Sequence, residues 1–367
     1  MAGPAIGDVS IRGRAPQALE ELVRRLVLDG QLGSGAQLAV WVDGEPALDL
    51  AVGTGTWGQL RPDHLHPAYC LLKPVLAIGA ALAARQQGRT IDEPIGALWP
   101  DCPAALESLS IRAVAQHQAG LSDPTAAAWR LLPEPDRGEV LSVARPVAGP
   151  AYSEVVGGLL LEAVAEHLTG RPTVDHVMTQ VLHGLGVADD LLLTADATTA
   201  AARSHRLCVP VTSHGSGAVP LLSELLTSQT QRSRPAFGGA ASASGVARFY
   251  EAVARGLRAA TPSPLEATLQ DLTSATTDAF DDPLVGNRLA FRGPFMTDLG
   301  GSGISTTISR GAFGHTGGMT VALGFHDPDR RMTVGLYANG MVTRPATTVA
   351  LRSAIVDAAL GWADGRA

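Results

Sequence analysis

Strand-like and helix-like patterns are unevenly distributed along the chain, and this distribution constrains the fold. Two apolar runs at 36–42 and 45–52 flank Asp43-Gly44, a dipeptide typical of a tight hairpin turn. Strand signals return toward the C-terminus, at 311–315, 319–326 and 332–338. Because distant antiparallel strands commonly complete one sheet, we expect a single sheet built from both ends of the chain.

The middle of the chain has a helical character instead. Helical patterns separated by Pro- and Gly-containing loops occupy 111–117, 137–143, 155–168 and 173–183. Further helices are predicted at 16–30, 69–84, 245–257 and about 346–362. The sequence therefore predicts an α+β protein with an antiparallel sheet flanked by helices and an inserted, mainly helical lobe. We place the α/β lobe at 1–66 and 245–367 and the helical lobe at 67–244, with the active site between them.

Charge and composition exclude several classes of partner. The net charge is −7, the pI is near 5.8 and no basic run occurs, which argues against nucleic acid and anionic membranes. Residues 1–8 lack the pattern of a secretory signal. The three cysteines give an odd count without a disulfide framework or metal spacing. We expect a cytoplasmic protein with small-molecule partners, and the sequence leaves its oligomeric state open.

One lysine stands out in this composition. The 28 Lys+Arg residues are 27 arginines and Lys73 alone, within Cys70-Leu71-Leu72-Lys73. A partly buried lysine can act as a base, whereas arginine cannot lose its proton. Pro74 places these residues at the start of a helix, where positions three apart share a face. The pattern indicates an activated thiol, although a buried structural cysteine remains an alternative.

Other motifs point away from cofactor and metal chemistry. Gly53 to Gly58 match G-x-G-x-x-G, but Arg61-Pro62 follow where a dinucleotide site needs a helix, so we interpret the match as a turn leaving the hairpin. His64-Leu65-His66 lacks the spacing of a zinc site. No G-x-S-x-G elbow is present. We expect no cofactor and no metal.

Three elements in order carry a family resemblance: Cys70-x-x-Lys73, Tyr152-Ser153-Glu154 and His315-Thr316-Gly317. The pattern resembles the serine β-lactamases and penicillin-binding proteins. It is most similar to the branch with class C β-lactamases, esterases of that fold and related acyltransferases. The phrase LSIRAVAQHQAGL at 109–121 adds to the likeness.

The resemblance implies a role for each matching position. It places the nucleophile at Cys70, with Lys73, Tyr152 and His315 as further catalytic residues. It implies an oxyanion hole formed by the backbone N–H groups of Cys70 and Gly318. The substrate-binding positions that it implies are Glu154, Thr316 and Gly317.

Three departures from the family pattern refine the expected chemistry. Cysteine replaces serine at Cys70, glutamate replaces asparagine at Glu154, and histidine replaces lysine at His315. Glu154 suits a substrate that carries an N–H group or an amine. His315 is not dependably cationic near neutral pH, which weakens the case for a β-lactam carboxylate.

The cysteine favours acyl transfer, because amines attack a thioester more readily, relative to water, than they attack an oxygen ester. We expect an acyltransferase that forms an amide without ATP from an ester or thioester donor. The loops at 122–150 and 209–244 are expected to form the walls of the acyl and acceptor pockets. A hydrolase of the esterase or amidase type and an inactive binding homologue remain alternatives. The sequence also leaves open an engineered Ser→Cys change at Cys70 and the identity of donor and acceptor.

Overall fold

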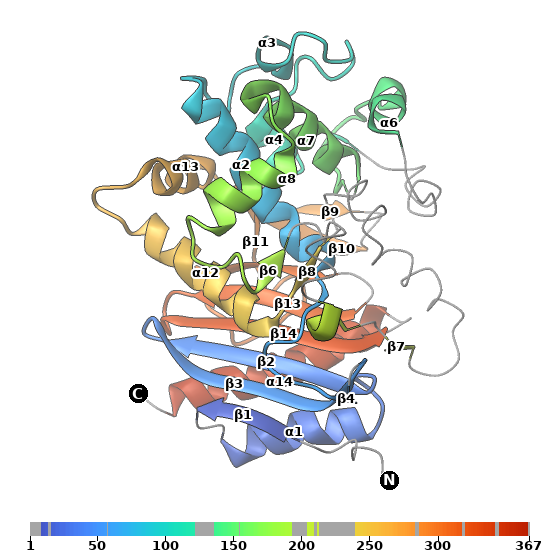
Figure 1. Cartoon of the computed structure of the whole chain (residues 1–367), viewed down its shortest axis with the longest axis vertical. Coiled ribbons are helices and arrows are strands. Elements are labelled where there is room, and N and C mark those ends of the chain that lie inside the picture. The colour runs from blue at the N-terminus through green and yellow to red at the C-terminus, as the bar shows by residue number, and fades with distance from the viewer. Residues whose placement is uncertain are drawn as a thin grey trace.

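The computed structural model describes most of the chain, drawn in colour in Figure 1. The described residues are 9–13, 16–56, 58–121, 136–153, 155–192, 204–208, 211–212, 239–282, 286–317, 320–341 and 345–365.

Most helices gather in one half of the molecule and most strands in the other (Figure 1). The α-helices are α1 (Gln17–Leu28), α2 (Lys73–Gln86), α3 (Ile95–Leu98), α4 (Ile111–Ala115), α6 (Arg137–Val143), α7 (Val156–Thr169), α8 (Thr173–His176), α12 (Ala243–Leu257), α13 (Pro264–Leu272) and α14 (Pro345–Asp364). Other helical turns are the 3₁₀ segments η1 (Tyr69–Leu72) and η3 (Ser204–Arg206) and the π-helical η2 (Val177–Leu182).

The strands are β1 (Val9–Gly13), β2 (Gly35–Val42), β3 (Glu45–Gly55), β4 (Gly58–Gln59), β5 (His66–Pro67), β6 (Leu191–Leu192), β7 (Val211–Thr212), β8 (Ala240–Ala241), β9 (Phe280–Asp282), β10 (Asn287–Arg292), β11 (Phe295–Thr297), β12 (Phe313–Gly317), β13 (Thr320–Asp327) and β14 (Met332–Met341).

One large sheet combines strands from both ends of the chain. Its order is β1-β3-β2-β14-β13-β12-β11-β10-β9, with β4 paired to β3 and β7 paired to β14. Antiparallel β2 and β14 join the two ends, and Leu38 lies opposite Leu336. The predicted α+β architecture with one sheet from both termini is therefore confirmed. The division into lobes at residues 66 and 244 stays a prediction.

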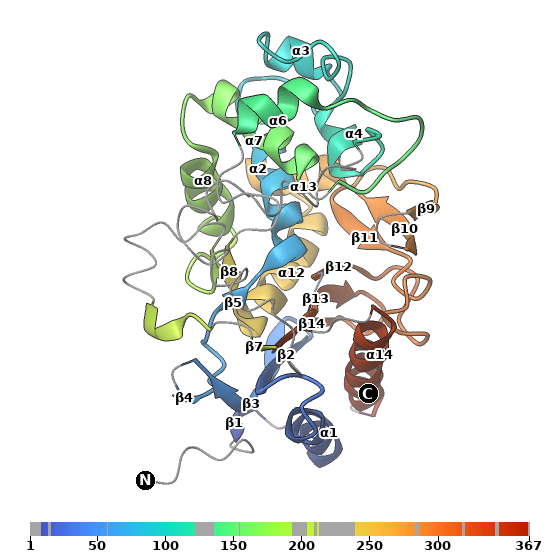
Figure 2. The same cartoon turned by 90° about the vertical axis from the view of Figure 1, so that its right-hand side faces the viewer.

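Helices cover both faces of this sheet. Figure 2 views it nearly edge-on, with α1 and α14 on one side and α12 on the other. The side chains of Leu38, Val334 and Leu336 join the core beneath α1 and α14, while Tyr337 joins the core on the side of α12 and α2. The alternation follows from the two-residue period of a strand.

Two glycines let α12 approach the sheet closely. Gly324 of β13 pairs with Gly335 of β14. A Cβ at Gly324 would collide with Val246 and the ring of Tyr250, and one at Gly335 would collide with the backbone of Ala243. The pair therefore fixes the N-terminal half of α12 against the two central strands.

Several local predictions are confirmed and others need correction. Gly53 to Gly58 lead from β3 back into β4 rather than into a helix, as expected for a turn. The helix predicted at 173–183 is divided between α8 and η2. The sequence did not anticipate α13 or β9 to β11. Among the described helices, none is long and apolar enough to cross a membrane.

Candidate active site

Cys70 lies in a 3₁₀ turn that leads directly into α2. The turn covers Tyr69–Leu72 and the α-helix starts at Lys73, so the helix predicted from residue 69 begins as a tighter turn. Pro74 is accommodated because the first turn of an α-helix needs no N–H donor there. Side chains three positions apart are eclipsed in a 3₁₀ turn, which puts Cys70 and Lys73 on one side. The Lys73 Nζ donates a 3.2 Å hydrogen bond to the Cys70 Sγ.

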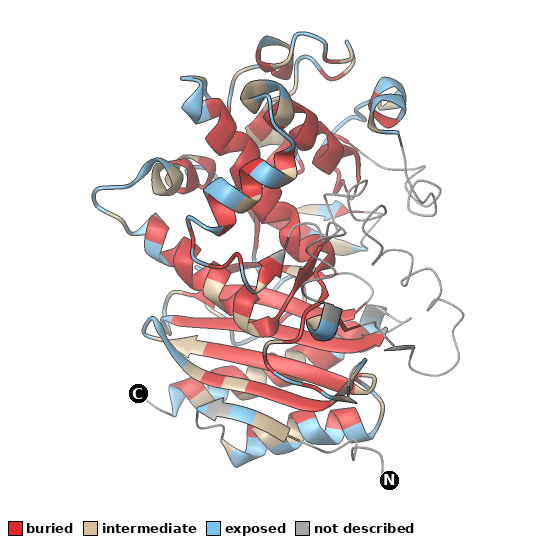
Figure 3. Cartoon of the chain, in the orientation of Figure 1, coloured by how far each residue is buried: buried red, intermediate tan, exposed pale blue. Residues whose placement is uncertain are grey.

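This pair is largely withdrawn from water. Cys70 is 7% exposed and Lys73 is 9% exposed. Figure 3 shows α2 buried along most of its length. Charge interactions strengthen as water is excluded, so the ammonium and the sulfur influence each other more than they would at the surface.

Tyr152 brings an aromatic ring to the same place. Its ring centroid lies 5.2 Å from the Lys73 Nζ, within the range of a cation–π contact. Its backbone N–H donates a 2.7 Å hydrogen bond to Oδ2 of Asp282, at the end of β9. Because Asp282 is buried, this bond fixes the loop before α7 to the sheet.

His117 fixes the same loop from the other side. Its Nδ1 accepts a 3.0 Å hydrogen bond from the Ser153 backbone N–H, and its carbonyl accepts one of 3.0 Å from the Ala151 N–H. Its ring stacks on Tyr152 with centroids 4.3 Å apart. Burial, and then the charge of Lys73, lower the pKa of His117 well below its ordinary value. A neutral imidazole protonated on Nε2 satisfies this geometry.

His315 approaches from β12. Its ring centroid lies 6.3 Å from that of Tyr152, and its Nδ1 lies 2.8 Å from the Thr316 carbonyl oxygen. Since a carbonyl can only accept, Nδ1 carries the proton and Nε2 is an acceptor. Within the described part of the chain, Nε2 has no hydrogen-bond partner. Burial, and then Lys73, lower the pKa of His315 to about 3, so the ring is neutral near pH 7.

The remaining predicted site residues are only partly described. Thr316 is half-buried beside His315, with its Oγ1 3.9 Å from the Met296 Sδ, and Gly317 is buried at the end of β12. Glu154 and Gly318 lie outside the described residues, as do most of the loops expected to form the substrate pockets. The structure thus brings together Cys70, Lys73, Tyr152 and His315.

A comparison with known protein families places the chain. The β-lactamase family profile matches residues 19–358. The chain belongs to the β-lactamase family. No curated protein sequence matches it.

Solved structures share the fold of this β-lactamase family member at low sequence identity. A family VIII carboxylesterase aligns with a TM-score of 0.72 at 20% identity, covering 95% of this chain and 100% of the esterase. The D-amino acid amidase from Ochrobactrum anthropi SV3, complexed with L-phenylalanine, gives 0.72 at 18% identity over 95% and 98% of the chains. A penicillin-binding protein homologue from Caulobacter crescentus gives 0.71 at 18% identity over 95% and 100%. At these identities the likeness establishes the fold.

In this β-lactamase family chain, Lys73 interacts with each of the other three residues of the site. Its Nζ contacts the thiol of Cys70 and lies over the ring of Tyr152, and its charge helps to keep His315 neutral. A thiol that is hydrogen-bonded to an amine can exchange a proton with it. The arrangement is suited to forming and cleaving a covalent intermediate on sulfur.

Sequence reasoning missed two residues that position Tyr152. His117 lies in the phrase that resembles the family, so a signal existed, although it did not indicate a contact with Tyr152. Asp282 lies on a short strand with no pattern of its own. Both reach the site through contacts between distant parts of the chain.

Proposed function

We propose that this protein is an acyltransferase that moves an acyl group from an ester or thioester donor to an amine through an acyl-Cys70 thioester. The observation that supports this most directly is the 3.2 Å hydrogen bond between the Lys73 Nζ and the Cys70 Sγ in a buried turn. An ammonium held beside sulfur favours the thiolate, which is the reactive nucleophile. The product is an amide formed without ATP, a reaction useful in small-molecule biosynthesis.

In the first half of the proposed reaction, the thiol proton passes to the Lys73–Tyr152 pair, which leaves the Lys73 ammonium beside the thiolate, and the Cys70 Sγ attacks the acyl carbonyl carbon. The carbon–sulfur bond forms, and the alcohol or thiol of the donor leaves with a proton. The backbone N–H groups of Cys70 and Gly318 hold the oxyanion.

In the second half, an amine nitrogen attacks the thioester carbon. Tyr152 removes the amine proton with the help of Lys73, while the neutral His315 accepts a hydrogen bond through Nε2. Glu154 binds the amine, and Thr316 and Gly317 line the acyl site. The carbon–nitrogen bond forms, the carbon–sulfur bond breaks, and Cys70 is regenerated.

A hydrolase of the esterase or amidase type is the second candidate. It is favoured by the family match and by the fold shared with a carboxylesterase and an amidase. An ester donor supplied with and without candidate amines separates the two functions. Amide formation at the expense of acid supports transfer, and acid released at the same rate in both cases supports hydrolysis.

A protein that binds without catalysis would differ from both enzymes. Intact-mass analysis after incubation with an activated acyl donor detects an acyl adduct, and the Cys70→Ala variant serves as the control. An adduct that disappears in this variant supports an acyl-enzyme. Absence of any Cys70-dependent adduct leaves a binding role. We further propose a cytoplasmic location, small-molecule partners and no cofactor.

A further inference from the structure

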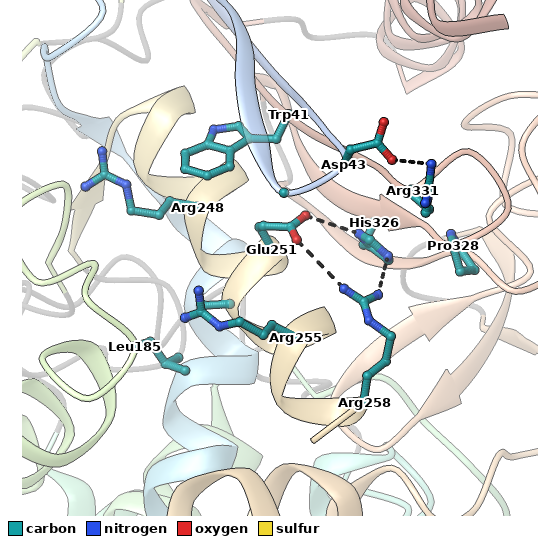
Figure 4. Close-up of a pocket in the computed structure, with 12 residues that line it drawn as sticks. Trp41, Asp43, Leu185, Arg248, Glu251, Arg255, Arg258, His326, Pro328 and Arg331 are labelled. Carbon is teal, nitrogen blue, oxygen red and sulfur yellow. Dashed lines mark hydrogen bonds and ion pairs between the residues drawn. The ribbon is translucent and has the colours of Figure 1, made fainter. Parts of the chain in front are cut away.

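A second pocket, separate from the residues around Cys70, opens between α12 and two turns of the large sheet (Figure 4). It measures about 760 Å³ and is bounded by the β2–β3 turn at Asp43 and the β13–β14 turn at Pro328. Pockets for small organic molecules commonly span roughly 300–1,000 Å³. The cavity is thus large enough for a metabolite.

One face of α12 lines this pocket with charged side chains. Arg248, Glu251 and Arg255 of α12 and Arg258 at its C-terminal cap follow at intervals of three or four residues, so they lie on one side of the helix. The other side of α12 packs against the sheet through Val246 and its neighbours. The charged stripe therefore faces the cavity as a consequence of how the helix is seated.

Positive charge exceeds negative charge in the lining. Four arginines and two carboxylates contribute to it, although the whole chain has a net charge of −7. Arg331 pairs with Asp43 at 2.6 Å, and Arg248 pairs with Asp190 at 3.1 Å. Arg255 forms no close ion pair with any residue that the structure describes, although its charge adds to the hydrogen bond from Ser263 in lowering the pKa of Glu266. Its guanidinium group is available to an anion.

The floor of the pocket holds Arg258 through a directional hydrogen-bond chain. The Thr333 hydroxyl donates to Oε2 of Glu251 at 2.7 Å, so it accepts from Nδ1 of His326, 2.8 Å away. This leaves the lone pair of the His326 Nε2 for Nη1 of Arg258, at 3.5 Å. Burial lowers the pKa of His326, in keeping with a neutral ring. Glu251 forms an ion pair with Nη2 of Arg258 at 3.9 Å, so a carboxylate and a neutral imidazole both contact the guanidinium.

The arginine side chains enter the pocket from two sides. In Figure 4, Arg248 and Arg255 lie on the side of Trp41 and Leu185, whereas Arg258 points toward His326. Guanidinium groups bind phosphate oxygens through paired N–H donors, and Trp41 adds an apolar wall for an organic group. We propose that this pocket binds a small molecule that carries a diphosphate group. The site is independent of the chemistry at Cys70.

Calorimetric titration with inorganic pyrophosphate, without divalent metal and at constant ionic strength, tests this site. Wild-type protein is expected to bind saturably, and Arg255→Gln is expected to weaken binding by about tenfold, the loss typical of one charge-assisted contact. Arg171→Gln is the matched control, because it removes an exposed arginine outside the pocket. Circular dichroism establishes that each variant is folded.

Glu251→Gln is expected to change the affinity for pyrophosphate in the opposite direction to Arg255→Gln, a result that a loss of folding could not produce. Removing this negative charge from the floor should tighten pyrophosphate binding, while glutamine retains an acceptor for Thr333. Three results would overturn the proposal: no saturable binding, equal weakening by Arg171→Gln and Arg255→Gln, or weaker binding by Glu251→Gln. Citrate that binds as tightly as pyrophosphate would overturn the assignment to phosphate.

Discussion

The backbone N–H of Tyr152 donates a 2.7 Å hydrogen bond to Oδ2 of Asp282, a residue 130 positions later in the chain. Tyr152 is thereby fixed by a strand at the edge of the large sheet, while its ring lies near Lys73. The position of the phenol depends on a buried carboxylate that takes no part in the proposed proton transfers.

Asp282→Ala should leave this buried N–H without its acceptor. We expect the free energy of unfolding to fall by about 1–3 kcal/mol, the usual cost of an unsatisfied buried group. Acylation of Cys70 should slow as well, because Tyr152 loses its anchor. Urea denaturation and time-resolved intact-mass analysis measure the two effects. Asp281→Ala changes the exposed neighbour and should have neither effect.

Lys73→Arg separates charge from proton transfer. Arginine retains a positive charge near Cys70 but does not release its proton, so it cannot serve as a base. We expect acylation to slow by at least about 100-fold, as for loss of a general base. Near-normal acylation in this variant would show that only the charge matters, and Lys73→Met would then be the variant that fails.

Cys70→Ser changes the intermediate from a thioester to an oxygen ester. We expect an acyl-enzyme to form still, with the ratio of amide to acid product lower by about tenfold, equivalent to about 1.4 kcal/mol in relative barriers. Product analysis by chromatography at a fixed amine concentration gives the ratio. An unchanged ratio would contradict the proposed role of sulfur in favouring transfer.

The three thiols should differ in reactivity. Burial raises the pKa of both Cys102 and Cys208 to about 11, whereas Cys70 has the Lys73 Nζ beside it. Iodoacetamide near neutral pH should therefore modify Cys70 first. Peptide mapping after brief labelling identifies the modified residue, and Lys73→Met should slow its labelling. Preferential modification of Cys102 or Cys208 would contradict this order.

Stability should fall as the solution is acidified. Burial lowers the pKa of His66 and of His315 to about 3, whereas an unfolded histidine titrates near its ordinary value of about 6.5. Between these values the unfolded chain binds more protons, so each histidine reduces the free energy of unfolding by about 1.4 kcal/mol per pH unit. Above about pH 6.5 each histidine is neutral in both the folded and the unfolded chain, so the loss of stability begins only below that pH.

Urea denaturation at several pH values between about 7 and about 5 measures this slope. His66→Gln should reduce it by the contribution of one proton, whatever its effect on absolute stability. His167→Gln, which removes an exposed histidine, is the control. A slope that His66→Gln leaves unchanged would contradict the buried, neutral state of His66.

The sequence predicted the parts of the fold that have strong local patterns. Asp43-Gly44 indicated the β2–β3 hairpin, and the alternating C-terminal runs indicated β13 and β14. β9 and β11 are three residues long, which is too short for a clear period, and β10 and α13 lie in stretches for which no element was predicted. Their positions depend on pairing and packing with distant residues.

The contacts of the candidate site also divide into those that the sequence could predict and those that it could not. Cys70 and Lys73 are three residues apart, so the sequence alone could predict their contact. The contacts of His117 and Asp282 with the Tyr152 loop join residues 36 and 130 positions apart, and no local pattern encodes them. The 3₁₀ geometry of η1 also escaped prediction, because Pro74 marks a helix start without specifying the turn before it.

The pairing of β2 with β14 has a consequence for synthesis. A ribosome delivers β2 well before β14, so β2 lacks this neighbour while residues 43–331 are made. A transcript truncated before residue 332 would yield a chain whose central β2 has an open edge, and such edges promote aggregation. Completion of the sheet therefore requires synthesis through residue 341, and until then the edge of β2 that faces β14 stays unpaired.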